Sequence, residues 1–471
     1  MRGGAAAGEA PAATKVLASM VCGTAFDDLP LIVVSEAKAH IMDCLGVGLA
    51  ASGEEPGRVI LSLLDGLGAA GGRNRLLGSP QTASTWDAAW ANGCLCHLLD
   101  FDDTHGHATS CILPAALAVG EREGVSGQDL IEAMVAGWEV FYRLQRAGQA
   151  AEPMMRRRGT HPTGIYGAPG AAAAAAKILD LSPDQTAIAI GLAASSSSGL
   201  TQQFGTWGKG LHAGNAARAG VIAALLAQRD YYGASDVLEG PYGFGSALLG
   251  GDLCDWSALE DDLGTSWALE NPGLSIKQYP ACGGTQRAIA AALAVREEVV
   301  DDPAHIASIE VRAPAALFDA LQVDRPERGF QGKFSLRFCV AAALVDGVVD
   351  VGTFTDESLG RPILQDTMRK VSISISSPGG GPRAHERLRT PVKVAMQDGS
   401  CSEHQVDMPR GNTRNPMTEQ EIAAKYRRCA SRVLPTAAVE RSVELLRRLE
   451  HARLEDVLGC LTTAREQFPG R

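Results

Sequence analysis

The sequence predicts a mainly α-helical protein, in which a large helical part is followed by a smaller inserted α+β unit and then by a return to helix. Three observations indicate this order. Apolar residues recur at helical spacing in the first part of the chain, for example over residues 31–51. Beyond Asn271 the spacing changes to the alternation that is typical of strands. Residues 421–461 are helical in pattern again.

Capping boxes mark three of the expected helix starts. In such a box a Ser or Thr side chain and the side chain three positions later satisfy each other's backbone N–H groups. The boxes are Ser126–Asp129, Ser182–Gln185 and Thr418–Glu421. An alanine-rich helix is expected over residues 171–181, and another is expected to begin at Pro114 because proline favours the first helical turn.

The inserted unit contains the residues that alternate as strands do. The expected strands are Ser308–Arg312, Val371–Ile375, Val392–Met396 and Cys401–Met408. The last two are joined through Asp398-Gly399, which predicts a hairpin. Apolar stretches over residues 288–295 and 335–345 predict helices between the strands.

These patterns divide the chain into four segments. Residues 1–15 are expected to be a disordered tail, because they are Gly/Ala-rich and lack the apolar core of a signal peptide. The others are a first helical part over 16–270, an α+β unit over 271–408 and a helical return over 409–471. The two boundaries of the inserted unit would form a cleft.

Composition narrows the classes of function. The net charge of −11 argues against a nucleic-acid partner, which would require a basic surface. No apolar run is long enough to cross a bilayer, so no membrane association is expected. The 11 cysteines are scattered without a Cys-x-x-Cys pair, which favours reduced thiols in a cytoplasmic protein and argues against a zinc or iron–sulfur centre.

Residues 97–109 hold the densest chemistry of the chain, with three histidines, three carboxylates and two threonines. If residues 91–104 form a helix, Asp100 and Thr104 share a face with His97, while Asp102 points away. Such a group suits proton transfer, since a histidine titrates near neutrality and a carboxylate can orient it.

Two other interpretations of this stretch stay open. Asp and Thr side chains near a helix end often only satisfy backbone groups. A metal site is the second alternative, but His107 follows a glycine on a loop and the chain has no His-Glu-x-x-His helix, so we predict no metal.

Two further stretches would place polar groups near helix N-termini. His161 and Tyr166 open the alanine-rich region, where a substrate carboxylate would be favoured, although His161 alone also fits a structural role. Lys209 lies between two glycines in an expected loop and is predicted to anchor a carboxylate or, if desolvated, to act as a base. His212 would follow on the next helix, on one face with Asn215 and Arg218.

Other candidate nucleophiles are less well supported. Lys277 and Cys282 lie at the start of the inserted unit and could reach across the cleft, but a cysteine without a neighbouring histidine is usually inert. The serines at 195–198 lack the Gly-x-Ser-x-Gly turn that exposes a nucleophile.

Six motifs occur in an order that resembles the MmgE/PrpD family. They are Leu99-Asp-Phe-Asp-Asp-Thr-His105, His161-Pro-Thr-Gly, Lys209 with His212-Ala-Gly-Asn-Ala-Ala-Arg218, Leu238-Glu-Gly-Pro, Lys277-x-Tyr-Pro-Ala-Cys and Lys333-Phe-Ser. That family includes 2-methylcitrate dehydratases, cis-aconitate decarboxylases and an iminodisuccinate epimerase. The resemblance implies a large all-helical domain interrupted by an α+β lid, a homodimer, and a site between the domains that needs neither metal nor cofactor.

Carried over residue by residue, the resemblance implies a set of site residues. The expected catalytic residues are Asp100, His107, His161 and Lys209. The expected substrate-binding residues are Thr104, Tyr166, His212, Lys277 and Cys282. This chain departs from the family twice: Ala108-Thr109 follows His107 in place of Pro-Ser, and Cys282 lies in a segment where many members have a histidine.

The resemblance implies proton abstraction next to a carboxylate of a small di- or tricarboxylate. The expected activity is that of a lyase, first a 2-methylcitrate dehydratase, with cis-aconitate decarboxylation or epimerisation of a dicarboxylate such as iminodisuccinate as alternatives. From another class, the protein could bind a polycarboxylate without turnover. In each case the expected partner is a small anionic carboxylate.

Overall fold

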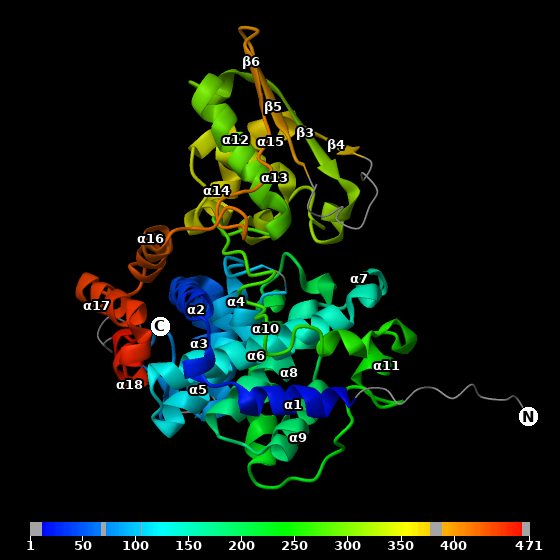
Figure 1. Ribbon diagram of the computed structural model, residues 1–471. Coiled ribbons are helices and arrows are strands. Elements are labelled where there is room, and N and C mark those ends of the chain that lie inside the picture. The colour runs from blue at the N-terminus through cyan, green and yellow to red at the C-terminus, as the bar shows by residue number, and fades with distance from the viewer. Residues whose placement is uncertain (1–11, 67–71, 105, 377–388, 464–471) are drawn as a thin grey trace, which may run out of the picture.

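The computed structural model describes residues 12–66, 72–104, 106–376 and 389–463, and it is mainly helical (Figure 1). The helices of the first part are α1 (Ala13–Gly23), α2 (Leu31–Ser52), α3 (Glu55–Gly66), α4 (Thr85–Leu98), α5 (Ala108–Glu123), α6 (Gly127–Ala147), α7 (Glu152–Arg158), α8 (Pro162–Ile178), α9 (Pro183–Ala194), α10 (Gly208–Ala227) and α11 (Phe244–Leu248). A short hairpin, β1 (Asn74–Arg75) with β2 (Thr82–Ala83), lies between α3 and α4. None of these helices, nor any other in the described residues, combines the length and apolar character of a membrane span.

A smaller unit of mixed structure follows. Its elements are α12 (Gln286–Val299), β3 (Ile306–Pro314), α13 (Leu336–Asp346), α14 (Asp356–Gly360), α15 (Pro362–Lys370), β4 (Val371–Ser376), β5 (Val392–Met396) and β6 (Cys401–His404). The strands form one sheet in the order β4-β3-β5-β6, in which only the β3–β4 pair is parallel. The chain then returns to helix in α16 (Glu419–Ala430), α17 (Thr436–Arg447) and α18 (Leu454–Cys460).

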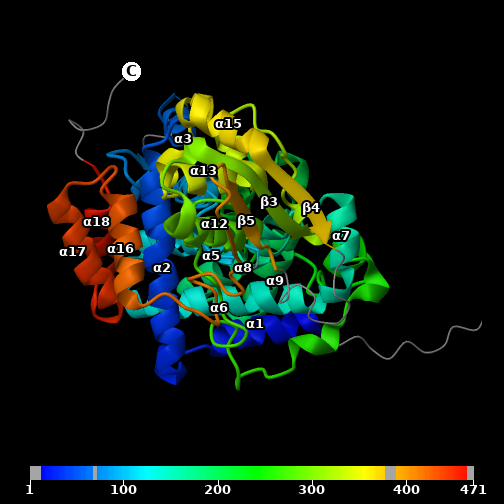
Figure 2. The same ribbon diagram turned by 90° about the horizontal axis from the view of Figure 1, so that it is seen from above.

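Each part has its own apolar core. One cluster of buried side chains joins the first helices to the C-terminal ones, and α16 packs against α2. A second cluster runs from Tyr279 to Met396 and lies between the sheet and helices α12, α13 and α15. The mixed unit lies over the helical layer in Figure 1, and Figure 2 shows α16–α18 beside α2 at its flank.

Helices α4 and α10 cross at unusually short range. A Cβ atom added at Gly214 would lie 2.3 Å from the sulfur of Cys94 and 2.4 Å from the carbonyl oxygen of Trp90, so only glycine fits there. A Cβ at Gly93 would likewise meet the backbone of Gly214 at 2.9 Å. This close crossing matters for the site because His97 ends α4 and Lys209 begins α10.

Several predictions of local structure are confirmed. All three capping boxes form, at the starts of α6, α9 and α16. The predicted hairpin is the β5–β6 pair, whose turn contains Gly399 with a φ of +91°. The described part of the chain is mainly helical, as predicted, and the residues of the second core fall within the inserted unit that we placed at 271–408.

Other local predictions were wrong. The helix expected over 91–104 ends at Leu98, because Asp100 has a φ of +52°, which no α-helix accommodates. Pro114 lies inside α5, which begins earlier at Ala108, and the alanine-rich helix is α8 rather than residues 171–181. Lys209 is in the first turn of α10 rather than in a loop. Of the predicted tail, residues 1–11 lie outside the described residues, whereas Ala13 already begins α1.

Candidate active site

Six charged or titratable side chains meet where the two parts of the structure join. We call them the Lys209 cluster; its members are His97, Asp100, Asp102, His107, Lys209 and Lys277. They come from the end of α4, the turn after it, the N-cap of α5, the first turn of α10 and the segment that leads into the mixed unit. Segments that are distant in the sequence therefore converge at one point.

Asp100 lies between two lysines. Its Oδ1 accepts hydrogen bonds from Lys209 Nζ at 2.7 Å and from Lys277 Nζ at 2.9 Å. Burial by itself would raise the pKa of Asp100, but the two ammonium groups outweigh it and hold that pKa well below its usual value. Asp100 also gives Lys277 a raised pKa despite the burial of this lysine. The carboxylate thus keeps two buried lysines charged.

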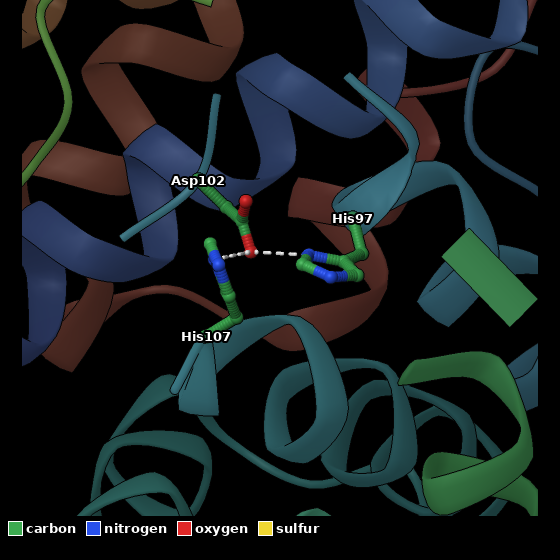
Figure 3. A group of neighbouring side chains, drawn as sticks. All are labelled: His97, Asp102 and His107. Atoms are coloured by element: carbon green, nitrogen blue, oxygen red, sulfur yellow. Dashed lines mark hydrogen bonds and ion pairs between the residues drawn. The ribbon is translucent and has the colours of Figure 1, made fainter. Parts of the chain in front are cut away.

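Asp102 lies between two imidazoles (Figure 3). Its Oδ2 is 3.0 Å from His97 Nδ1 and 3.2 Å from His107 Nδ1. Burial would raise the pKa of Asp102, yet the contacts with His107 and His97 keep it well below the usual value. The prediction that Asp102 points away from the cluster was therefore wrong, because the helix on which it depended stops before Asp100.

Lys209 closes the network from the opposite side. Its Nζ lies 2.9 Å from His97 Nε2 and 3.4 Å from His107 Nε2. Phe204 and Phe334 cover the ammonium, with ring centroids at 5.4 and 5.7 Å. Phe334 belongs to the core of the mixed unit, so this unit contributes to the cover of the site.

Both histidines of the network resist protonation. Burial first, and then Lys209, lower the pKa of His97 to about 3. Burial also lowers the pKa of His107, although Asp102 partly offsets this effect. The side chain of His107 is 15% exposed and that of His97 is fully buried, so a ligand meets His107 first.

The turn that holds the cluster is fixed by backbone contacts. The Thr104 N–H donates to Ser275 O at 3.0 Å, which places Lys277 opposite Asp100. Lys425 of α16 donates to the carbonyl oxygens of Phe101 and Lys277, both at 2.8 Å, and pairs with Asp43 at 2.7 Å. The C-terminal helices therefore support the site from below, and the sequence analysis missed both members of this ion pair.

His161 and His212 form a second pair beside the cluster. Their Nδ1 atoms are 2.8 Å apart, and His161 Nε2 lies 2.9 Å from Thr163 Oγ1. Burial, reinforced by Lys209, lowers the pKa of both histidines, that of His212 to about 4. The His161 ring stacks on His97 at 5.7 Å, but both of its nitrogens already have protein partners. A direct role for His161 would require one of these bonds to break.

The remaining predicted residues are placed unequally. Thr104 Oγ1 is buried without a partner among the described residues, and is therefore available to a ligand. Cys282 is buried close enough to feel the charges of Asp100 and Lys277. Tyr166, in contrast, lies in the helical core and donates to the sulfur of Met155, so its predicted substrate-binding role has no geometric support.

A cavity of about 1300 Å³ opens elsewhere on the helical part. It is lined by β1, β2, the end of α5 and the second half of α10, and its lining includes no member of the Lys209 cluster. Two of its arginines are paired, Arg75 with Glu121 and Arg218 with Asp87. We therefore base the functional argument on the cluster.

Comparison with protein families decides the relationship of the chain. Residues 15–257 match the MmgE/PrpD N-terminal domain and residues 279–451 match the MmgE/PrpD C-terminal domain. The chain belongs to the MmgE/PrpD family.

Three relatives illustrate what this MmgE/PrpD chain is similar to. It is 28% identical to cis-aconitate decarboxylase of Mus musculus over 468 residues, which covers 94% of this chain and 91% of the relative. It is 29% identical to cis-aconitate decarboxylase of Homo sapiens, with 96% and 94% covered. Cis-aconitate decarboxylase of Aspergillus terreus is also 29% identical, with 93% and 92% covered.

The structure of this MmgE/PrpD chain joins three of the four predicted catalytic residues, Asp100, His107 and Lys209, by direct hydrogen bonds or close contacts. It adds His97 and Asp102, which no spacing in the sequence would select, because both act through contacts made after α4 has ended. Lys425 had a weak signal, since it lies among apolar positions of its helix, next to Tyr426.

One trio in this cluster has the geometry of a metal site. Ligand atoms of His97, Asp102 and His107 all lie within 4.8 Å of one another. Lys209 contacts the far nitrogens of both rings, however, and Lys277 lies beyond it. A divalent cation would add two positive charges beside two ammonium groups that only Asp100 and Asp102 balance, so the trio fits protons better.

The depressed pKa of His107 can be tested with diethyl pyrocarbonate, which acylates only the unprotonated nitrogen of an imidazole. An ordinary histidine loses reactivity as pH falls through about 6.5. Because burial and the lysines lower the pKa of His107, its modification rate should stay constant down to below pH 6.5. Peptide mass spectrometry after timed exposure measures this rate, and half-loss at pH 6.5 or above would contradict the lowered pKa.

Cys282 can be tested as a nucleophile. Burial raises its pKa, so the side chain is a thiol rather than a thiolate at neutral pH. We expect Cys282→Ser to keep kcat within about threefold of the parent value, because serine preserves size and polarity. Steady-state kinetics of the variant give the answer, and a loss of several hundredfold would show that the sulfur takes part in the reaction.

Proposed function

We propose that this protein is a lyase that decarboxylates a small unsaturated tricarboxylate, with cis-aconitate as the first candidate. The observation that supports this most is the Lys209 cluster, in which two buried ammonium groups and two imidazoles share two carboxylates. The relatives described above are named cis-aconitate decarboxylases and match nearly the whole chain.

The reaction sets two physical requirements. Loss of CO2 from the methylene carboxylate of cis-aconitate leaves an allylic carbanion whose charge spreads onto a remaining carboxylate. That charge needs fixed positive groups nearby, and the carbon then needs a proton. One proton is consumed in each turnover, because a trianion becomes a dianion and neutral CO2.

The cluster can meet both requirements. Lys209 and Lys277 supply a positive field that Asp100 holds in place, in a region from which burial excludes water. The buried hydroxyl of Thr104 is a donor for a substrate carboxylate. His107 is the most exposed member of the Asp102–His97–His107 group, so substrate would approach the lysine from the His107 side.

Dehydration of 2-methylcitrate, the activity that the sequence analysis ranked first, becomes the second candidate. The decarboxylase name of the relatives favours loss of CO2 over loss of water. Epimerisation and binding without turnover also remain distinguishable alternatives. The homodimer and the cytoplasmic location expected from the sequence stay predictions.

A panel of substrates tests the proposal. Purified protein is incubated separately with cis-aconitate, 2-methylcitrate and iminodisuccinate, and products are identified by NMR. We expect an unsaturated dicarboxylate and equimolar CO2 from cis-aconitate alone. Consumption of 2-methylcitrate with cis-aconitate left unchanged would overturn decarboxylation in favour of dehydration, and tight binding of all three without turnover would favour the non-catalytic alternative.

A further inference from the structure

The hydrogen bonds around Asp102 determine where the protons of the cluster lie. An ionised carboxylate can only accept hydrogen bonds, and a neutral imidazole carries one N–H. Because Asp102 Oδ2 faces the Nδ1 atoms of both His97 and His107, each ring must carry its proton on Nδ1. Both Nε2 atoms are then lone-pair acceptors.

Lys209 provides an independent check of this assignment. An ammonium group has three N–H donors and no acceptor. Its three partners are Asp100 Oδ1, His97 Nε2 and His107 Nε2, all of which must accept. A proton on either Nε2 would point at a donor, so the contacts on the two sides of the rings agree.

We propose that Asp102 is a positioning residue that fixes both histidines in the Nδ1–H form, so that the transferred proton is stored on Lys209 and passes through His107 Nε2. This inference rests on the proposed decarboxylation and deepens it, because it names the proton donor. The role differs from that of Asp100, which holds the lysines and makes no bond to either Nδ1 atom.

The steps balance as follows. After CO2 leaves, a proton of Lys209 passes to the Nε2 lone pair of His107, which becomes an imidazolium stabilised by Asp102. The imidazolium gives the Nε2 proton to the allylic carbanion, and a C–H bond forms. Lys209 is left as a neutral amine, and one proton from water restores the ammonium. The net uptake is one proton, as the reaction requires.

The first experiment reads the protons directly, without substrate. Full-length protein labelled with ¹⁵N-histidine is examined by NMR, and the signals of His97 and His107 are assigned by their loss in His97→Gln and His107→Gln. We expect both rings to show a protonated Nδ1 and an unprotonated Nε2 at pH 7. A protonated Nε2 on either ring would overturn the inference, whatever the substrate proves to be.

The second experiment tests the consequence for turnover. Asp102→Asn keeps the shape of the side chain but removes its charge and introduces a donor. We expect kcat to fall at least about 10²-fold while KM changes less than about threefold, as when the carboxylate that orients a catalytic histidine is lost. An unchanged kcat would refute the positioning role, and a fall in kcat with an equal rise in KM would assign Asp102 to substrate binding instead.

The neighbouring residue Asp103 offers a matched control. It is buried in the same segment but accepts from the backbone and hydroxyl of Thr109 and touches neither imidazole. Burial first, and then Asp102, raise its pKa well above the usual value, so a neutral amide resembles its protonated form. Asp103→Asn should keep kcat within about threefold. An equal loss in both variants would show that the effect is only structural.

Discussion

Replacing Lys209 by methionine is expected to lower kcat for cis-aconitate by a factor on the order of 10³ or more, because both charge stabilisation and the proton are lost. The ammonium contacts Asp100, His97 and His107, and no other described lysine contacts all three. The variant should fold, since Lys277 still neutralises Asp100 and methionine fills the space under Phe204 and Phe334.

Steady-state kinetics and thermal unfolding of the variant test this expectation together. Lys38→Met is the matched control, since Lys38 pairs with Glu450 at the surface, far along the chain from the cluster. The control should keep full activity. Turnover by Lys209→Met within threefold of the parent enzyme would remove Lys209 from the mechanism, and the decarboxylation that depends on it would need another donor.

Replacing Asp100 by asparagine is expected to reduce both activity and stability. Lys209 and Lys277 would lose the carboxylate that compensates their burial, and removing one partner of a buried ion pair typically costs about 3–5 kcal/mol. The lysines would also become easier to deprotonate, so we expect kcat to fall by about 10² or more. Denaturant unfolding and kinetics measure the two effects.

Asp180 is the matched control for Asp100. It has the same left-handed backbone, with a φ of +50° against +52°, but its side chain is exposed. Asparagine tolerates this conformation as well as aspartate does, so Asp180→Asn should change neither stability nor activity. If Asp100→Asn were as stable and active as Asp180→Asn, the proposed dependence of the two lysines on Asp100 would be wrong.

Local sequence patterns predicted much of the fold. The capping boxes at Ser126, Ser182 and Thr418 determine helix starts through contacts within one turn, and all three form. The Asp398-Gly399 hairpin is equally local. The end of α4 could not be predicted in this way, because aspartate is only one of many residues that can follow a helix in a left-handed conformation.

The site was predicted where a motif names the residue and missed where tertiary contacts decide its role. Asp100, His107 and Lys209 lie in motifs of the family, and the structure brings them together. Asp102 lies in the same motif, yet its role depends on how far α4 extends and on the direction in which α5 begins. Lys425 acts from the C-terminal helices, and no local pattern links it to Phe101.

The most direct test of the central claim, that this cluster delivers a proton to a carbanion formed by loss of CO2, is turnover of cis-aconitate in heavy water. Released CO2 is quantified, and the deuterium content and position in the product are read by NMR and mass spectrometry. We expect one carbon-bound deuterium per molecule of CO2, located next to a carboxylate, and none in the presence of Lys209→Met enzyme. Product without carbon-bound deuterium, or consumption of substrate without CO2, would contradict the account.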